Sequence, residues 1–209
     1  MIRMRRLVLV RHGESDANSK ERLVGSGDPA LSAEGREQMQ RARMRLMGQV
    51  IDLVVASPAR RAWQSAQLLT GGARARLEAD LREIDFGRWE GRTLEELEAA
   101  DPVAFRQWRD GAPEFEYPNG ELRASFRARV ARGLERLLGS PATSALVVSH
   151  KGVIRAIVEK LTGQTLPDRA QPALGQVLIL TRQPNGGWML GMHSSNPPGV
   201  ENPAAALAG

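Results

Sequence analysis

The chain has 209 residues, no cysteine, 25% charged residues and a formal net charge of +5. This length suits one domain, or two, with a sizeable core, and the lack of cysteine excludes a disulfide framework, a cysteine nucleophile and a cysteine-based metal site. The arginines that supply most of the positive charge are scattered through predicted helices. We therefore interpret them as solvated helix faces, and the low aromatic content of 4% argues against a surface that stacks single-stranded nucleic acid.

The N-terminal segment is basic, and the apolar run that follows it, residues 7–10, is too short for the apolar region of a signal peptide. No stretch of the sequence approaches the length of a membrane span. We therefore expect a soluble, cytoplasmic protein.

Short apolar runs predict the strands of a sheet. Three buried strands are predicted at residues 7–10, 53–56 and 145–148, a further strand at about 75–81, and a final strand pair at 177–181 and 188–191. The sequence Asn-Gly-Gly at 185–187 is typical of the turn inside such a pair. Because the first strands alternate with helices, we expect an α/β fold: a three-layer sandwich whose mainly parallel sheet carries helices on both faces.

The helices are predicted from the spacing of apolar residues and from residues that favour helix starts. The clearest four begin at Ser32, at Ser57-Pro58, near Leu122 and at Gly152. Pro58 is expected near the first helical position, where its missing N–H costs no hydrogen bond. We read about 86–140 as a helical excursion outside the sheet, 1–193 as a single domain, and the Pro-, Ala- and Gly-rich segment 194–209 as a disordered tail.

Polar residues follow three of the predicted strands, at the edge of the sheet where open α/β proteins bind their ligands. Arg11 and His12 end the first strand, Arg61 follows the second, and His150 ends the later one. Two histidines and two arginines at one edge repel one another unless an anion lies between them. Arginine matches phosphate oxygens, and amides of the helix at Gly152 would also face an anion, so a tetrahedral oxyanion is the predicted ligand.

This grouping indicates phosphoryl-transfer chemistry. Neutral imidazole is a good nucleophile toward phosphorus, and nearby cations favour the neutral form. The arginines and a protonated second histidine would stabilise charge on the equatorial oxygens. A leaving alkoxide also needs a proton, and Glu83 and Asp85, just past the third predicted strand, are the candidate acids. Spacing alone does not distinguish them.

Five segments carry a recurring pattern in chain order. They are residues 9–14 with Asn18, 31–38, 57–66, 81–91 and 147–155, and they include Arg11-His12-Gly13-Glu14 and Trp89-Glu90-Gly91. In this order they resemble the histidine phosphatase superfamily, also called phosphoglycerate mutase-like, in its phosphatase branch. The resemblance implies the phosphoglycerate mutase-like fold.

The resemblance also implies a role for each matching residue. His12 would be the phosphorylated nucleophile, and Glu83 would be the proton donor. The residues that would bind the phosphoryl group are Arg11, Asn18, Arg61 and His150. Lys151 stands where the family usually has glycine; its ammonium group would reach the far end of the substrate or point to solvent, and both readings stay open.

The resemblance therefore implies a metal-independent phosphoric monoester hydrolase without a cofactor, and no spacing of carboxylates and histidines matches a standard metal site. We expect a small phosphorylated metabolite as its partner, and neither nucleic acid nor a membrane; a homodimer stays open. Two alternatives also stay open: a cofactor-dependent phosphoglycerate mutase, and a non-catalytic phosphate-binding regulatory module. The segment 83–91 resembles the phosphatases more than the mutases, and the identity of the substrate is left open.

Overall fold

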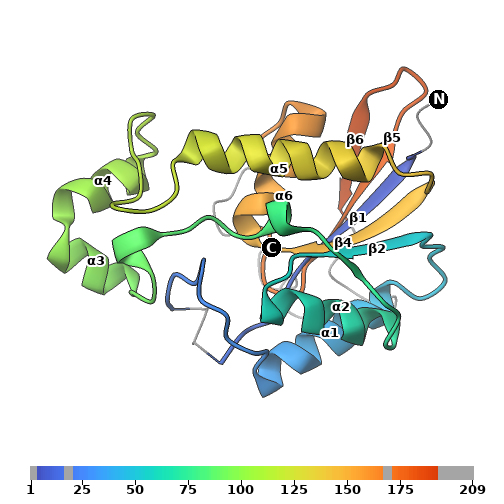
Figure 1. The fold of residues 1–209 in the computed structure, drawn as a ribbon, viewed down its shortest axis with the longest axis horizontal. Helices are drawn as coiled ribbons and strands as arrows, with labels where there is room; N and C mark the ends of the chain where they lie inside the picture. The colour runs from blue at the N-terminus through green and yellow to red at the C-terminus, as the bar shows by residue number, and fades with distance from the viewer. Residues whose placement is uncertain (1–3, 17–20, 167–170, 193–209) are drawn as a thin grey trace, which may run out of the picture.

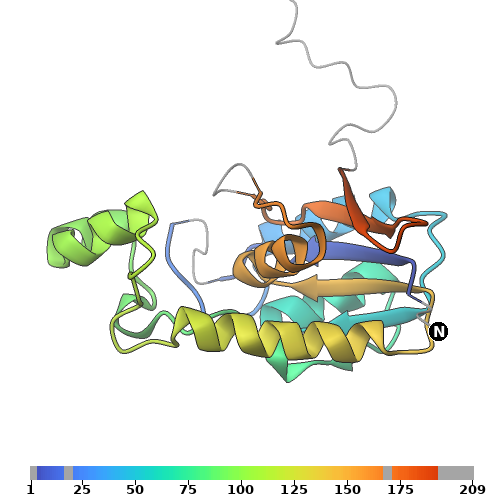
Figure 2. The same ribbon diagram turned by 90° about the horizontal axis from the view of Figure 1, so that it is seen from above.

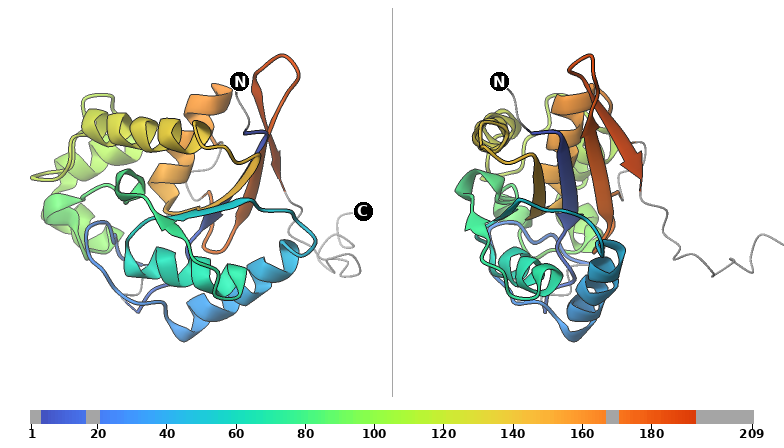
Figure 3. Two further views of the ribbon diagram at one scale, coloured as in Figure 1. Left: turned by 45° about the vertical axis from the view of Figure 1, so that its right-hand side comes forward. Right: turned by 90° about the vertical axis from the view of Figure 1, so that its right-hand side faces the viewer.

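The computed structural model describes residues 4–16, 21–166 and 171–192. Six strands form one sheet in the order β3-β2-β4-β1-β5-β6. The strands are β1 (Arg6–Arg11), β2 (Leu53–Ala56), β3 (Arg76–Leu77), β4 (Ser144–Ser149), β5 (Val177–Arg182) and β6 (Trp188–Met192). The first four in chain order run parallel, whereas β5 pairs antiparallel with β1 and with β6, which forms a hairpin at the edge of the sheet (Figure 3).

Helices cover both faces of this sheet. The helices are α1 (Ala33–Arg45), α2 (Arg60–Thr70), α3 (Leu94–Ala100), α4 (Pro102–Asp110), α5 (Arg123–Leu138) and α6 (Lys151–Thr162), with short 3-10 turns η1 (Ala79–Leu81) and η2 (Gly87–Trp89). In Figure 1, α5 runs along one side of the sheet, and α1 and α2 lie on the other side. The predicted three-layer α/β sandwich with a mainly parallel sheet is therefore confirmed.

The alternation of side chains along β1 shows why both faces need a cover. Leu7 and Leu9 point into a core built with α5 and α6, while Val8 and Val10 point into a second core built with α1 and α2. All four side chains are fully buried. Strands with two buried faces appear in the sequence as continuous apolar runs, which is the pattern that predicted β1 and β4.

Two predicted elements differ from the structure. The third strand is only Arg76–Leu77 long, because the Glu78 carboxylate accepts a bond from the amide of Asp80 and the chain turns into η1. The second helix begins at Arg60 rather than at Pro58. The backbone turns at Ser57 instead, whose hydroxyl oxygen lies 3.3 Å from the amide of Ala59.

The segment from η2 to α4 forms a small separate cluster beyond the sheet. Trp89, Leu97, Phe105 and Phe115 make its apolar centre. Figure 2 shows α3 and α4 extending beyond the end of α5, away from the sheet. The sheet ends, the loops after them and this cluster together surround the site described below. Within the part of the chain that the structure describes, no helix combines the length and apolar character needed to cross a membrane. Residues 194–209, for which we expected a disordered tail, lie outside the described ranges.

Candidate active site

The predicted cluster at the sheet edge is present. Arg11 ends β1 and His12 follows it, while His150 directly follows β4, the neighbouring parallel strand. The rings of the two histidines lie 5.0 Å apart between centroids and meet edge to face. Arg61, in the first turn of α2, reaches the same point, and its side chain is fully buried, as is that of His150. The parallel register thus brings together residues that are far apart in sequence.

The hydrogen bonds of His12 define which ring nitrogen carries the lone pair. Nδ1 lies 2.7 Å from the carbonyl oxygen of Gly13, which only accepts, so Nδ1 carries the hydrogen. Nε of Arg61 lies 3.3 Å from Nε2 of His12 and donates to it. Nε2 therefore holds the lone pair and faces the guanidinium. Gly13 has no room for a side chain, because a Cβ there would lie 2.4 Å from the carbonyl oxygen of Gly35.

Arg61 is held in place by backbone carbonyls. Nη1 donates to Gly27 at 2.7 Å, and Nη2 donates to Val24 and Gly25 at 3.1 and 3.0 Å. The loop that supplies these carbonyls is held in turn by the carboxylate of Glu90, which accepts bonds from the amides of Gly25 and Gly27 at 2.9 Å each. Glu90 therefore fixes the guanidinium of Arg61 through the loop without touching His12 itself.

Glu83 reaches the same site from the segment after η1. Its Oε2 accepts a bond from the amide of Gly152 at 3.1 Å, and its Oε1 accepts one from the amide of Ile84 at 3.1 Å. We expected the amides at the start of α6 to face a bound anion; the structure instead gives the Gly152 amide to the Glu83 carboxylate. A Cβ at Gly152 would lie 2.5 Å from Oε1 of Glu83, so this contact requires glycine.

Asp85, the alternative acid, has a different position. Its side chain is exposed, and its carboxylate accepts a bond from the amide of Gly87 at 2.9 Å, which stabilises the local turn. Glu83 lines a cavity of about 160 Å³ together with Arg11 and His12, and Asp85 is absent from the residues that line this cavity. The geometry therefore favours Glu83, which spacing alone did not.

The backbone around Glu83 is held by Arg129 of α5. The guanidinium donates to the carbonyls of Asp80, Arg82 and Glu83 at 3.0, 2.6 and 2.9 Å, and it pairs with both carboxylate oxygens of Glu121 at 2.7 Å. The Arg129 side chain is only 14% exposed. Our interpretation of the helical arginines as solvated faces is therefore wrong for Arg129, because it donates to three backbone carbonyls and pairs with a carboxylate.

Two polar nitrogens at the site are buried and lack a hydrogen-bond partner among the described residues: Nε of Arg11 and Nδ1 of His150. The remainder of each side chain is anchored, since Arg11 donates from Nη1 to the carbonyl of Pro172 at 3.0 Å and Nε2 of His150 lies 2.8 Å from the hydroxyl of Ser57. Buried polar atoms are normally satisfied, and in functional sites the exceptions point to a ligand. These two nitrogens are thus suited to bind the oxygens of an anion.

Burial and the neighbouring charges both favour neutral histidines at the site. Burial lowers the pKa of His12 well below its ordinary value, and the positive charges of Arg61 and Arg11 lower it further. Burial, followed by Arg61 and His12, also lowers the pKa of His150. Neutral His12 agrees with our expectation, with burial rather than the cations as the larger cause. Without an anion in the site, both burial and the arginines disfavour the charged form that we expected of the second histidine.

The arginines remain cationic. Burial lowers the pKa of Arg11 to about 10, and Glu83 opposes that shift. Burial also lowers the pKa of Arg61 from its ordinary value. A guanidinium with a pKa near 10 is still protonated at neutral pH, so the site keeps two positive charges beside two neutral imidazoles. This arrangement matches a phosphoryl group in both shape and charge.

Of the two remaining predicted residues, the structure describes Lys151 but not Asn18. Lys151 is the first residue of α6, is half-buried and lines the cavity that contains His12. Asn18 lies outside the described residues. The described residues contain no group of three or more histidine, aspartate or glutamate side chains arranged to hold a metal ion.

Sequence reasoning assigned no role to four residues that support the site: Ser57, Ser65, Glu90 and Arg129. Ser65 of α2 accepts from the amide of Gly13 at 3.2 Å and donates to the carbonyl of Arg61, one turn earlier in the same helix, at 2.7 Å, so it links α2 to the loop after β1. Ser57, Ser65 and Glu90 fall inside the segments that carry the family pattern, which was a usable signal. Arg129 had no signal, because α5 carries arginine at many positions.

Comparison with known proteins agrees with this site. Residues 7–194 match the histidine phosphatase superfamily, branch 1. A glucosyl-3-phosphoglycerate phosphatase from Mycolicibacterium vanbaalenii is 34% identical over 83% of this chain and 80% of its own length. Phosphoserine phosphatase 1 from Hydrogenobacter thermophilus is 32% identical over 78% of this chain and 79% of its own length.

The fold has similar solved structures. The crystal structure of the alpha-ribazole phosphatase from Shigella flexneri superposes with a TM-score of 0.79 at 29% identity, and the match covers 94% of this chain and all of that one. The matched range of the family includes His12, Arg61, Glu83 and His150. The chain therefore belongs to the histidine phosphatase superfamily, branch 1.

Proposed function

We propose that this protein hydrolyses phosphomonoesters of small metabolites through a phosphohistidine formed on Nε2 of His12. One observation carries the proposal: Nε2 of His12 holds a lone pair in a buried site and faces Nε of Arg61 at 3.3 Å. A neutral imidazole fixed through Nδ1 attacks a phosphoryl group once the Nε N–H of Arg61 turns from this lone pair to an oxygen of the bound phosphoryl group. The roles below follow from that arrangement.

In the first step, Nε2 of His12 attacks phosphorus and the bond from phosphorus to the ester oxygen breaks. Glu83, in its protonated form, gives its proton to the departing oxygen, so the alcohol leaves neutral. The charge on the equatorial oxygens is stabilised by Arg11, Arg61 and His150. His150 donates from Nδ1, which requires the hydroxyl of Ser57 to donate to its Nε2.

In the second step, water attacks the phosphorus of the phosphohistidine. The Glu83 carboxylate accepts a proton from this water, the bond from Nε2 to phosphorus breaks, and inorganic phosphate leaves. His12 returns to its neutral form and Glu83 to its protonated form, so the cycle closes without any further reactant. The same carboxyl group can serve as acid and then as base because two backbone amides hold it in the wall of the cavity that contains His12.

The relatives support a small substrate. Phosphoserine, glucosyl-3-phosphoglycerate and alpha-ribazole phosphatases all act on small phosphorylated metabolites, as their names state. A cofactor-dependent mutase is the second candidate, because it would use the same nucleophile. In a mutase the phosphoryl group returns to a substrate hydroxyl, so its activity depends on a bisphosphorylated primer.

We also propose that the reaction needs no metal. Two arginines and two histidines already supply the cation and the donors that a metal ion would otherwise provide. Exhaustive chelation is therefore expected to leave the rate unchanged, and vanadate is expected to inhibit because its five-coordinate form resembles the transition state. Loss of activity on chelation, restored by magnesium or zinc, would show that the proposal of metal independence is wrong.

The proposed function is tested by phosphate release from a panel of phosphomonoesters, with the wild-type protein and with His12→Ala. We expect release that does not depend on a bisphosphorylated primer and that falls by several orders of magnitude in His12→Ala. Activity that requires the primer would identify a mutase. Full activity in His12→Ala would exclude His12 as the nucleophile, and no release from any ester by either protein would contradict the phosphatase assignment.

A further inference from the structure

A second cavity continues from the active site toward the cluster formed by η2, α3 and α4. It has a volume of about 250 Å³. It shares five lining residues with the cavity that contains His12: Leu23, Glu83, Phe86, Trp108 and Lys151. Because Glu83 lies at the junction, a group attached to the ester oxygen of a substrate phosphorylating His12 would extend past Glu83 into this second space. We call it the leaving-group cavity.

The wall of the leaving-group cavity is mainly aromatic and apolar. The aromatic residues that line it are Phe86, Trp108, Phe115 and Tyr117. Tyr117 meets the rings of Phe86 and Phe115 edge to face, with centroids 5.0 Å apart in each pair. These contacts hold the rings in fixed orientations, so the wall is preformed. A wall of this kind gains free energy from an apolar ring and gains little from a chain of hydroxyl groups.

Two of the cations that line the cavity are already bound to the backbone. Arg123 donates from Nη1 to the carbonyls of Ala112, Pro113 and Phe115. Arg155 donates from Nη1 to Gln171 and from Nη2 to Leu166, at 3.0 and 3.1 Å. A substrate carboxylate that bound Nη1 of Arg123, or Nη1 or Nη2 of Arg155, would compete with bonds that shape the cavity itself. Lys151, the remaining cation, lines both cavities and thus lies at their junction, as Glu83 does.

We infer that the leaving-group cavity selects phosphomonoesters whose alcohol carries an apolar group of ring size, over esters of short hydroxy acids or polyols. The inference rests on the proposed function, because it assumes that the phosphoryl group is transferred to His12. It concerns only what the other end of the substrate contacts. Burying one additional apolar group in such a pocket is commonly worth about 10- to 200-fold in kcat/KM.

Alkyl esters with matched leaving groups test this directly. Ethyl phosphate and 2-phenylethyl phosphate both release a primary alcohol of similar basicity, so Glu83 has the same task with each. We expect kcat/KM for 2-phenylethyl phosphate to exceed that for ethyl phosphate by on the order of 10- to 100-fold, and to exceed the values for phosphoserine and 3-phosphoglycerate. Equal values for the two alkyl esters, or a preference for either acid, would overturn the inference.

This outcome is separable from failure of the proposed function. If the esters are hydrolysed at similar rates and His12 is phosphorylated, the proposed function stands and the leaving-group cavity does not select substrates. If no ester phosphorylates His12, the proposed function fails, and the inference fails with it.

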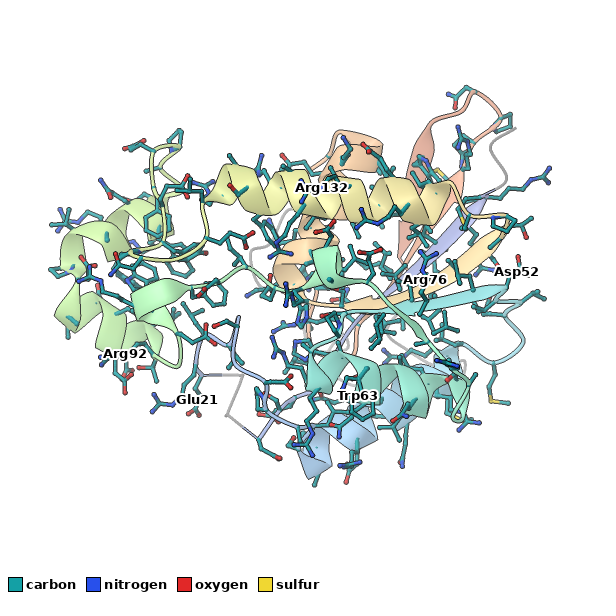
Figure 4. The ribbon with its side chains drawn as sticks, in the orientation of Figure 1. Glu21, Asp52, Trp63, Arg76, Arg92 and Arg132 are labelled. Atoms are coloured by element: carbon teal, nitrogen blue, oxygen red, sulfur yellow. The ribbon has the colours of Figure 1, made fainter. Side chains whose placement is uncertain are left out.

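Two tryptophan variants test whether the preference for the phenylethyl ester arises at the leaving-group cavity. Trp108 lines the leaving-group cavity, whereas Trp63 lies on α2, away from α3 and α4, as labelled in Figure 4. We expect Trp108→Ala to lower the ratio of kcat/KM for the phenylethyl over the ethyl ester at least about 5-fold, and Trp63→Ala to leave it unchanged. The ratio is taken within one sample, so a misfolded fraction cancels. Ala112→Leu, which enlarges another side chain that lines the cavity, is expected to lower the same ratio. An unchanged ratio in both variants would overturn the inference.

Discussion

Nε of Arg61 lies 3.3 Å from Nε2 of His12, and both side chains are buried. The remaining nitrogens of this guanidinium donate to carbonyls of Val24, Gly25 and Gly27, so Arg61 cannot move without the loop moving too. That loop is held by Glu90. The position of the cation beside the nucleophile thus depends on a carboxylate outside the active centre.

Glu90→Gln is expected to slow phosphorylation of His12. Glutamine keeps the size of the side chain but removes the charge that strengthens the bonds to the amides of Gly25 and Gly27. Misplacement of a catalytic group by about 1 Å costs on the order of 100-fold in rate, and we expect a loss of about 10- to 100-fold in the single-turnover phosphorylation rate. Asp52→Asn is the matched control, because Asp52 also accepts from two backbone amides, at Thr143 and Ser144, but lies at the other end of the sheet (Figure 4).

Both substitutions remove charge-assisted bonds to backbone, so both are expected to reduce the free energy of unfolding. Only Glu90→Gln is expected to change the phosphorylation rate. Equal rates for Glu90→Gln and the wild type, at a concentration of folded protein checked by circular dichroism, would show that the loop holds Arg61 without help from Glu90.

Glu83→Gln tests whether Glu83 acts as a proton donor or only positions the substrate. An alkoxide leaves poorly unless it is protonated, and such a transfer is commonly worth about 100- to 10,000-fold, whereas nitrophenolate leaves with little help. Glu83→Gln should therefore slow phosphorylation of His12 by an alkyl phosphate far more than by p-nitrophenyl phosphate in single-turnover measurements. Asp85→Asn should show no such contrast, since Asp85 is exposed and stabilises its own turn. If Asp85→Asn instead slows the alkyl phosphate far more than p-nitrophenyl phosphate, the proton donor is Asp85 and not Glu83.

Gly152→Ala is expected to slow phosphorylation by alkyl phosphates more than by p-nitrophenyl phosphate, although Glu83 keeps its carboxyl group. The added Cβ would lie 2.5 Å from Oε1 of Glu83, so the carboxylate must shift. We expect a loss of roughly 10-fold with alkyl phosphates and a smaller loss with p-nitrophenyl phosphate. Alanine is also a better helix former than glycine, so the variant should not lose stability through helix propensity. Gly139→Ala, at the end of α5, is the control and should leave both rates unchanged.

The buried histidines predict a loss of stability in mild acid. In the folded protein the pKa of both His12 and His150 lies below the ordinary value, so the unfolded chain binds more protons than the folded one below about pH 6.5. Above that pH the histidines therefore do not reduce the free energy of unfolding. Below it, the free energy of unfolding falls as the pH decreases, by up to about 1.4 kcal/mol per pH unit for each histidine.

Urea unfolding between pH 7.5 and 5.5 measures this slope. His150→Asn removes one of the two groups, so its stability should fall less steeply with decreasing pH than that of the wild type, by close to one proton. Identical slopes for the two proteins would show that His150 titrates alike in the folded and unfolded chains.

The sequence predicted the main elements because their physical cause is local. Continuous apolar runs predicted β1 and β4, and the parallel order then brought Arg11, His12 and His150 to one edge. The third strand was overestimated, because the capping bond between Glu78 and Asp80 ends it after two residues and no apolar pattern reveals that bond.

The supporting residues of the site could not be predicted in the same way. Arg129 is one of many arginines in α5, and only the packed structure shows that it faces the carbonyls around Glu83. The task of Glu90 depends on a loop about 65 residues earlier, so no local pattern carries it. The protonation of His150 could not be predicted for a related reason: the balance between burial and neighbouring charge depends on three-dimensional packing.

The most direct test of the mechanism is the location of the phosphoryl group during turnover. The protein is mixed with an alkyl phosphate, quenched rapidly in base, where phosphohistidine is stable, digested and analysed by mass spectrometry. The mechanism predicts a phosphoryl group on the peptide that contains His12, attached at that ring. A phosphoryl group on any other residue, or none on His12 while phosphate is being released, would contradict it.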